Sequence, residues 1–182
     1  MAHIDLPDGL PGITGLLQFR PQTGQALTHL AQTLLRGNSP LKAAERELIA
    51  AYVSGLNECA FCHRSHAAAA RSLFGVERSV VDAVVRDLDS APVSGKMKAL
   101  LRIAAKVQQG GGNVIPEDIA AARTYGADDV EIHDTVLVAA AFCMYNRYVD
   151  GLATWAPEDG PAYDAMGDRL AAEGYGAANG NA

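Results

Sequence analysis

Two cysteines separated by two residues, Cys59 and Cys62, are the residues whose types and spacing most directly suggest chemistry. Side chains three or four positions apart share a helix face, so the two sulfur atoms can approach each other. The pair follows Asn57, a good N-cap residue, and the dipole and free N–H groups of a helix N-terminus favour a thiolate. A thiolate attacks a peroxide oxygen to give a sulfenic acid, and a neighbouring thiol then closes a disulfide. The spacing therefore predicts an attacking and a resolving sulfur.

Two histidines lie at helical spacing from these cysteines. His66 is four positions after Cys62, and His63 is four positions after Cys59, so spacing alone allows either pair. Helical side chains lean toward the N-terminus, which directs His66 back at Cys62. His63 follows Cys62 directly and points about 100° away from it around the helix, so it can assist only Cys59.

Less specific interpretations of these residues remain open. Buried cysteines also occur simply as small apolar residues in a core, and Cys143, inside an apolar run, is expected to be one. Zinc is another alternative, with Cys59, Cys62, His66 and His63 as ligands. A structural zinc site usually takes four ligands, often from two segments, and the sequence has no second cluster of cysteine or histidine. We therefore expect neither a metal nor a cofactor.

Helical periodicity and helix-capping signals dominate the rest of the sequence, and no strand alternation is evident. Residues 6–15 are rich in proline and glycine and are expected to form an irregular arm. Helices are expected over residues 21–36, 39–55, 57–75, 77–88, 94–109, 116–125, 128–152 and 161–173. The pattern predicts an all-α bundle with three parts: an N-terminal arm and first helix (1–38), a helical domain (39–173) and a disordered tail (174–182).

Composition limits the classes of partner and compartment. The 182 residues are 49% hydrophobic and 20% charged, with three cysteines and a net charge of -6. Nucleic acids and anionic membranes both require a basic surface, so neither is expected as a partner. The N-terminus lacks a signal-peptide pattern, and no apolar run approaches the ~20 residues that span a bilayer. We expect a cytoplasmic protein.

The segment from Glu47 to His66, ELIAAYVSGLNECAFCHRSH, resembles the core motif of the alkylhydroperoxidase D and carboxymuconolactone decarboxylase superfamily. The motif is a glutamate, eleven residues, Cys-x-x-Cys, three residues and a histidine. Residues 54–57 and 146–150 add a similarity to the peroxidase-related branch, and the resemblance covers about residues 41–152. It implies an all-α bundle of the alkylhydroperoxidase D type.

The resemblance also implies roles for the four motif residues. Cys62 would be the peroxidatic thiol, Cys59 the resolving thiol, and His66 with Glu47 a proton relay. The substrate would be hydrogen peroxide or an organic hydroperoxide, giving an antioxidant peroxidase. An external dithiol, such as a lipoyl-bearing protein, would complete turnover, and the subunits would form trimers or hexamers.

Two further points follow from the comparison of motifs. Well-known members of the family carry a histidine immediately before the second cysteine, where this chain has Phe61. The decarboxylase branch lacks the cysteine pair, so decarboxylation is not expected. Other functions compatible with the residues are thiol–disulfide exchange without peroxide, and a redox-sensing or zinc-stabilised binding protein without turnover.

Overall fold

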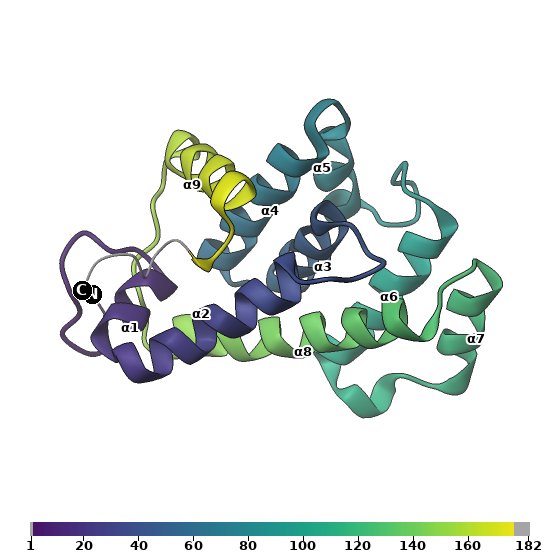
Figure 1. Ribbon diagram of the computed structural model, residues 1–182, viewed down its shortest axis with the longest axis horizontal. Helices are drawn as coiled ribbons and strands as arrows, with labels where there is room; N and C mark the ends of the chain where they lie inside the picture. The colour runs from purple at the N-terminus through teal and green to yellow at the C-terminus, as the bar shows by residue number, and fades with distance from the viewer. Residues whose placement is uncertain (1, 177–182) are drawn as a thin grey trace.

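The computed structural model describes residues 2–176, and these form an all-α bundle, as the sequence predicted (Figure 1). Over this span there are nine α-helices, two single-turn 3-10 helices and no strand. The α-helices are α1 (Ile13–Phe19), α2 (Pro21–Arg36), α3 (Ala43–Leu56), α4 (Ala60–Phe74), α5 (Ser79–Arg86), α6 (Gly95–Gln109), α7 (Pro116–Thr124), α8 (Asp129–Gly151) and α9 (Gly160–Glu173). The 3-10 helices are η1 (Gly75–Glu77) and η2 (Gly111–Asn113).

The hairpin of α3 and α4 forms the centre of the bundle. These two helices pack most extensively against each other, α9 covers α4, and α8 crosses both α3 and α6. Figure 1 shows the long α8 running along one side, with α6 and α7 at one end and α1 at the other. The larger hydrophobic core lies between α3, α6 and α8, and a smaller apolar cluster includes both Cys59 and Cys62. The cysteine pair is thus placed where α4 begins, beside α8 and α9.

Several helix boundaries follow directly from local signals. Asp128 caps α8 by accepting a hydrogen bond from the Glu131 backbone N–H at 2.8 Å, and the Glu131 carboxylate accepts from the Asp128 N–H at 3.0 Å. Ser94 caps α6 through a 3.1 Å bond from the Met97 N–H. Pro21 occupies the first position of α2.

The expected start of α3 at Ser39-Pro40 is wrong, because the helix begins at Ala43. The Ser39 hydroxyl donates to a carboxylate oxygen of Asp134 at 2.6 Å, and its oxygen accepts from the Leu41 N–H at 3.2 Å. Ser39 therefore holds the loop to α8 instead of capping a helix. The Glu45 carboxylate accepts from the Lys42 N–H at 2.8 Å, so the start of the helix is satisfied three residues later.

The expected capping of α4 by Asn57 is also wrong. Asn57 ends α3, Cys59 is the N-cap residue of α4, and Glu58 between them has a positive φ of 59°. The left-handed residue turns the chain sharply, and the Cys59 N–H donates to the Ser54 carbonyl at 3.0 Å. Both cysteines still lie at the first turn of the helix, as predicted.

Residues 13–15 and 174–176 are more ordered than the sequence predicted. The arm predicted over residues 6–15 includes the start of α1. Gly174, Tyr175 and Gly176, assigned from the sequence to a disordered tail, are described, and the Tyr175 side chain is bound in the interior. The rest of that tail, residues 177–182, lies outside the described residues. Within the described chain, no helix has both the length and the apolar character to cross a membrane.

Candidate active site

Glu47 is the centre of the polar network in the bundle. It lies on the face of α3 that packs against α4, and its side chain is completely buried. Its neighbours in the sequence, Glu45 and Arg46, are charged, and the motif is what predicted a functional position for Glu47. Arg46 is itself buried, and donates to the carbonyl oxygens of Leu34 and Gly37 at 2.9 Å each. This fixes the end of α2 against α3 and brings Arg36 to the site.

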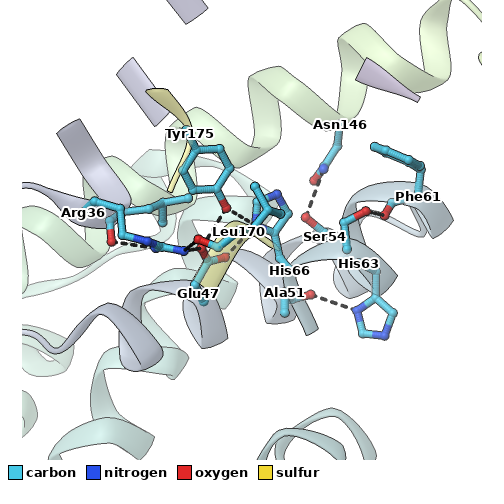
Figure 2. A network of polar contacts seen from close by, with 12 residues as sticks. Arg36, Glu47, Ala51, Ser54, Phe61, His63, His66, Asn146, Leu170 and Tyr175 are labelled. Atoms are coloured by element: carbon cyan, nitrogen blue, oxygen red, sulfur yellow. Dashed lines mark hydrogen bonds and ion pairs between the residues drawn. The ribbon is translucent and has the colours of Figure 1, made fainter. Parts of the chain in front are cut away.

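His66 is paired with Glu47, as the motif predicted. The imidazole Nδ1–H donates to Glu47 Oε2 at 2.7 Å, because a carboxylate can only accept (Figure 2). The ring packs edge-on against Phe142 with the centroids 4.5 Å apart. In residues 2–176, Nε2 has no hydrogen-bond partner. A lone pair on Nε2 can therefore accept a proton from a neighbouring group.

Two further residues of this network, Arg36 and Tyr175, were missed at the sequence level. An Arg36 guanidinium nitrogen lies 2.7 Å from Glu47 Oε1 in an ion pair, and the Tyr175 hydroxyl donates to the same oxygen at 2.7 Å. Figure 2 shows both side chains converging on Glu47. Burial alone raises the pKa of Glu47, but the charges of His66 and Arg36 and the bonds from His66 and Tyr175 outweigh it and hold that pKa below 4.5. Glu47 is therefore a carboxylate at neutral pH.

The environment of Cys62 favours its thiolate. A hydrogen bond from the Cys59 thiol is the largest cause that lowers the pKa of Cys62, and burial opposes it. The charge of His66 and a hydrogen bond from the Asn146 amide lower it further. The sulfur also lies in the first turn of α4, where the helix dipole stabilises negative charge. Cys62 is thus the more acidic of the two thiols.

Cys59 has the opposite character. Its hydrogen bond to Cys62 and its burial both raise its pKa, and a hydrogen bond to the Asp150 carboxylate adds to this. Its side chain is completely buried, and both thiols are free in this structure. The lower pKa of Cys62 and the higher pKa of Cys59 suit attack by Cys62 and resolution by Cys59.

Asn146, for which the sequence indicated no role, is held in one orientation by a chain of amides. The Gln108 amide donates to Asn57 Oδ1 at 3.0 Å, and Asn57 donates to Asn146 Oδ1 at 2.8 Å. The Asn146 amide nitrogen donates to the Ser54 hydroxyl at 3.0 Å (Figure 2). This chain directs the donor end of Asn146 toward the cysteine pair.

An apolar cavity of about 110 Å³ opens onto Cys62 and His66. It lies between α1, α2, α4, α8 and α9, and Phe61 forms part of its wall. Phe61 stands where well-known family members carry histidine, and its ring lies directly over Gly12, where any side chain would collide with it. Phe61 thus contributes an apolar surface and an anchor for the N-terminal arm. The remaining lining residues include the apolar Ile13, Leu17, Leu27, Met166 and Leu170.

His63 and the proposed zinc ligands do not gather into a second site. The His63 Nδ1–H donates to the Ala51 carbonyl at 3.0 Å, which fixes the ring against α3 (Figure 2). Across residues 2–176, no group of three or more histidine, cysteine or acidic side chains is arranged to hold a metal ion. Cys143 is buried in the larger core, as expected.

Comparisons with known proteins agree with this architecture. Residues 21–106 match the carboxymuconolactone decarboxylase family. An uncharacterised peroxidase-related protein from Silicibacter sp. TM1040 is 26% identical, with a TM-score of 0.79 over 91% of this chain and 95% of that one. An uncharacterised peroxidase-related protein from Ralstonia eutropha JMP134, with an alkylhydroperoxidase AhpD core, is 25% identical, with a TM-score of 0.76 over 87% and 81%.

A protein of unknown function from Agrobacterium tumefaciens shares the fold at 19% identity, with a TM-score of 0.69 over 87% of this chain and 100% of that one. No curated protein matches the chain significantly. The fold and the buried Glu–His pair beside two cysteines define an all-α protein of the alkylhydroperoxidase D type. The chain is thus similar to the carboxymuconolactone decarboxylase family over residues 21–106, and in its fold to two peroxidase-related proteins, one of them with an alkylhydroperoxidase AhpD core.

Proposed function

We propose that the protein is a thiol peroxidase that reduces hydrogen peroxide or organic hydroperoxides at Cys62. The observation that carries this proposal is that Cys62 and His66 line one apolar cavity, with the buried Glu47 bonded to the far side of the imidazole. A thiolate, a proton carrier and a space for a small substrate thus meet in one place. This arrangement is the one a peroxidatic cysteine requires.

The reaction begins with proton transfer from the Cys62 thiol to Nε2 of His66, while Glu47 stabilises the imidazolium through Nδ1. The thiolate attacks the nearer peroxide oxygen, a sulfur–oxygen bond forms, and the oxygen–oxygen bond breaks. The leaving alkoxide or hydroxide takes the proton from His66, giving an alcohol or water. Cys62 is then a sulfenic acid.

Resolution follows at Cys59. Its sulfur attacks the sulfenic sulfur of Cys62, water leaves, and a Cys59–Cys62 disulfide forms. Asp150, whose carboxylate helps to raise the pKa of Cys59, would take the proton of that thiol and pass it to the leaving hydroxide, which departs as water. An external dithiol then reduces the disulfide and is itself oxidised to a disulfide. Both sulfurs are buried, so this reductant must be small or carried on a narrow arm, as a lipoyl group is.

The same burial favours peroxide over a protein disulfide as the oxidant. Cys59 is 0% exposed and Cys62 is 3% exposed, so a folded protein partner cannot place its own disulfide against either sulfur. A peroxide can enter the cavity that opens onto Cys62. Peroxide is therefore the favoured oxidant, and thiol–disulfide exchange without peroxide is the less favoured candidate.

The test is a steady-state assay with hydrogen peroxide and an alkyl hydroperoxide, offered with several dithiols. We expect peroxide-dependent dithiol oxidation, lost in Cys62→Ser. Cys59→Ser should accumulate a sulfenic acid on Cys62, detected by a dimedone-type probe and mass spectrometry. Cys143→Ser, which removes the third cysteine from the core, is the matched control and should retain activity. Free thiols at both Cys59 and Cys62 after peroxide treatment would contradict the proposal.

A further inference from the structure

Tyr175 follows the last helix and returns to the centre of the molecule. Gly174 ends α9 with a φ of +70°, a conformation that side chains other than glycine rarely adopt. The Tyr175 N–H donates to Gln32 Oε1 at 2.7 Å, which fixes the segment against α2. Gly174 and Tyr175 also form part of the wall of the cavity that opens onto Cys62. This segment is therefore built into the candidate site.

The hydroxyl of Tyr175 lies between the two members of the relay. It donates to Glu47 Oε1 at 2.7 Å, and its oxygen lies 3.1 Å from Nδ1 of His66. The phenol and imidazole rings are nearly parallel, at 16°, with centroids 6.0 Å apart. The Arg36 guanidinium lies 5.2 Å from the phenol centroid, on the face of the ring. The tyrosine is thus fixed by both its ring and its hydroxyl.

The donor and acceptor in each of these hydrogen bonds follow from the ionised state of Glu47. A carboxylate can only accept, so the phenol proton points to Glu47 and a lone pair of the same oxygen faces Nδ1–H of His66. Nδ1–H then has two acceptors, Glu47 Oε2 at 2.7 Å and Tyr175 at 3.1 Å. A proton held on Nδ1 leaves the lone pair on Nε2, the nitrogen that must act as a base.

We propose that Tyr175 is a positioning residue of the relay, which holds His66 in the tautomer and orientation that serve Cys62. The proposal rests on the proposed function for its catalytic meaning, but it concerns the reactivity of a thiol and can be measured without peroxide. Arg36 and Tyr175 together occupy Glu47 Oε1, which leaves Oε2 for His66. Tyr175→Phe would keep the aromatic ring and remove the hydrogen bond from the hydroxyl to Glu47 Oε1.

The other titratable and charged groups around this network come from each neighbouring element. Arg36 is at the end of α2, Arg46 is on α3, Cys62 is on α4, Tyr145 is on α8, and Arg169, which lines the same cavity, is on α9. The Tyr145 hydroxyl donates to the Leu27 carbonyl at 2.9 Å, so it is already engaged. Burial and the adjacent Glu47 carboxylate raise the pKa of Tyr175 well above its usual value, so its hydroxyl stays protonated.

The experiment measures alkylation of Cys62 by iodoacetamide as a function of pH, with fragment mass spectrometry to separate Cys62 from Cys59. The midpoint is the pH at which the alkylation rate of Cys62 reaches half of its maximum. In Tyr175→Phe we expect this midpoint to move upward by about half a pH unit, with about threefold slower alkylation at neutral pH. The imidazolium loses one acceptor, so the thiolate beside it is less well stabilised. Tyr52→Phe removes a hydroxyl from a half-buried tyrosine on α3 away from the site, and should leave the midpoint unchanged.

A second variant tests the delivery of the tyrosine without removing its hydroxyl. Gly174→Ala strains the turn, and its Cβ would lie 2.6 Å from Gln32 Oε1. The midpoint should move in the same direction as in Tyr175→Phe. Gly126→Ala is the matched control, because Gly126 also has a positive φ but nothing lies within 4 Å of its Cβ position.

Two results separate this inference from the proposed function. A midpoint in Tyr175→Phe within about 0.1 unit of the wild-type value would overturn the positioning role, even if the protein consumes peroxide. A shifted midpoint in a protein that never consumes peroxide would support the role and overturn the peroxidase assignment. Thermal melting of each variant identifies any general loss of packing, which would lower the melting temperature without moving the midpoint.

Discussion

Glu47 divides its two oxygens between different partners. Oε1 accepts from Arg36 and Tyr175, while Oε2 accepts from His66 alone among residues 2–176. The pKa of Glu47 is lowered, so its carboxylate stabilises the fold above its unfolded pKa, and that contribution is lost as pH falls through the lower folded value. Between pH 5 and 8 the carboxylate therefore stays ionised, and a pH dependence of the site in this range does not come from Glu47.

The two histidines of α4 differ in their contacts, which gives a prediction at the residue scale. His66 faces the cavity and Glu47, whereas His63 bonds the Ala51 carbonyl. Positioned proton transfer contributes ~10²–10⁴-fold, so we expect His66→Ala to slow the oxidation of Cys62 by that factor. Glu47→Gln should behave in the same way, because the amide cannot hold the imidazolium.

His63→Ala is the control for this pair and should lose less than about tenfold. The measurement is the rate of Cys62 oxidation by peroxide across pH for each variant. A greater loss in His63→Ala than in His66→Ala would assign the relay to Cys59 and reverse the roles of the two cysteines.

At the scale of elements, the contact between α4 and α9 depends on a glycine. A Cβ added to Gly167 would lie 2.5 Å from the backbone carbonyl carbon of Ala68, so α9 approaches α4 as closely as two backbones allow. We expect Gly167→Ala to destabilise the protein by about 1–3 kcal/mol, because the helices must move apart. It should also slow Cys62 alkylation, since Tyr175 follows α9.

Gly160→Ala, in the first turn of the same helix, is the matched control, because nothing lies within 4 Å of its Cβ position. Denaturant unfolding gives the change in stability, and alkylation gives the effect on the site. Wild-type stability in Gly167→Ala would show that α9 can move without cost, contrary to this packing.

The helix boundaries show which signals are local. The limits of α2 were predicted within one residue at each end from Pro21 and Gly37, and the start of α8 from its capping pair. The start of α3 was not, because the Ser39 hydroxyl is taken by Asp134, which is 95 positions away. A capping residue with a distant partner looks the same in the sequence as one that caps a helix.

The site was predictable only as far as its motif extends. Spacing brought Cys59, Cys62 and His66 to one helix, and the motif added Glu47. Tyr175 lies in a segment of glycine, alanine and asparagine that resembles a disordered tail, and its partners are 109 and 128 positions away. No local pattern marks such a residue, because its order comes from the bonds it makes to α2, α3 and α4.

At the scale of the whole molecule, α8 carries an exposed apolar stripe. Val130, Leu137 and Met144 are seven residues apart and 49%, 40% and 44% exposed. A heptad spacing keeps side chains on one seam of a helix, the arrangement used when helices pack against one another. We propose that this stripe contributes to a contact between copies of the chain, in the trimers or hexamers that the family resemblance implies.

Light scattering at micromolar concentration should therefore give a mass well above 19.1 kDa. Leu137→Glu, which places a charge in the stripe, should lower that mass. Val76→Glu, at a fully exposed apolar residue in η1, is the control and should leave the mass unchanged. A wild-type mass of a single chain would contradict the assembly and the role of the stripe.

The long sequence separation of Glu47 and Tyr175 affects when Cys62 becomes reactive during folding. In an unfolded chain Cys62 is an ordinary thiol with a pKa of about 8.5, mostly protonated at neutral pH. The hairpin of α3 and α4 forms from nearby residues, but the bond from Tyr175 closes a separation of 128 positions, and such distant contacts are slow to form. During refolding, the reactivity of Cys62 should therefore rise after helix content does. The Cys62 thiol reaches full reactivity only after Tyr175 has bonded to Glu47. A newly synthesised chain therefore becomes sensitive to oxidants late in folding, after its helices have formed.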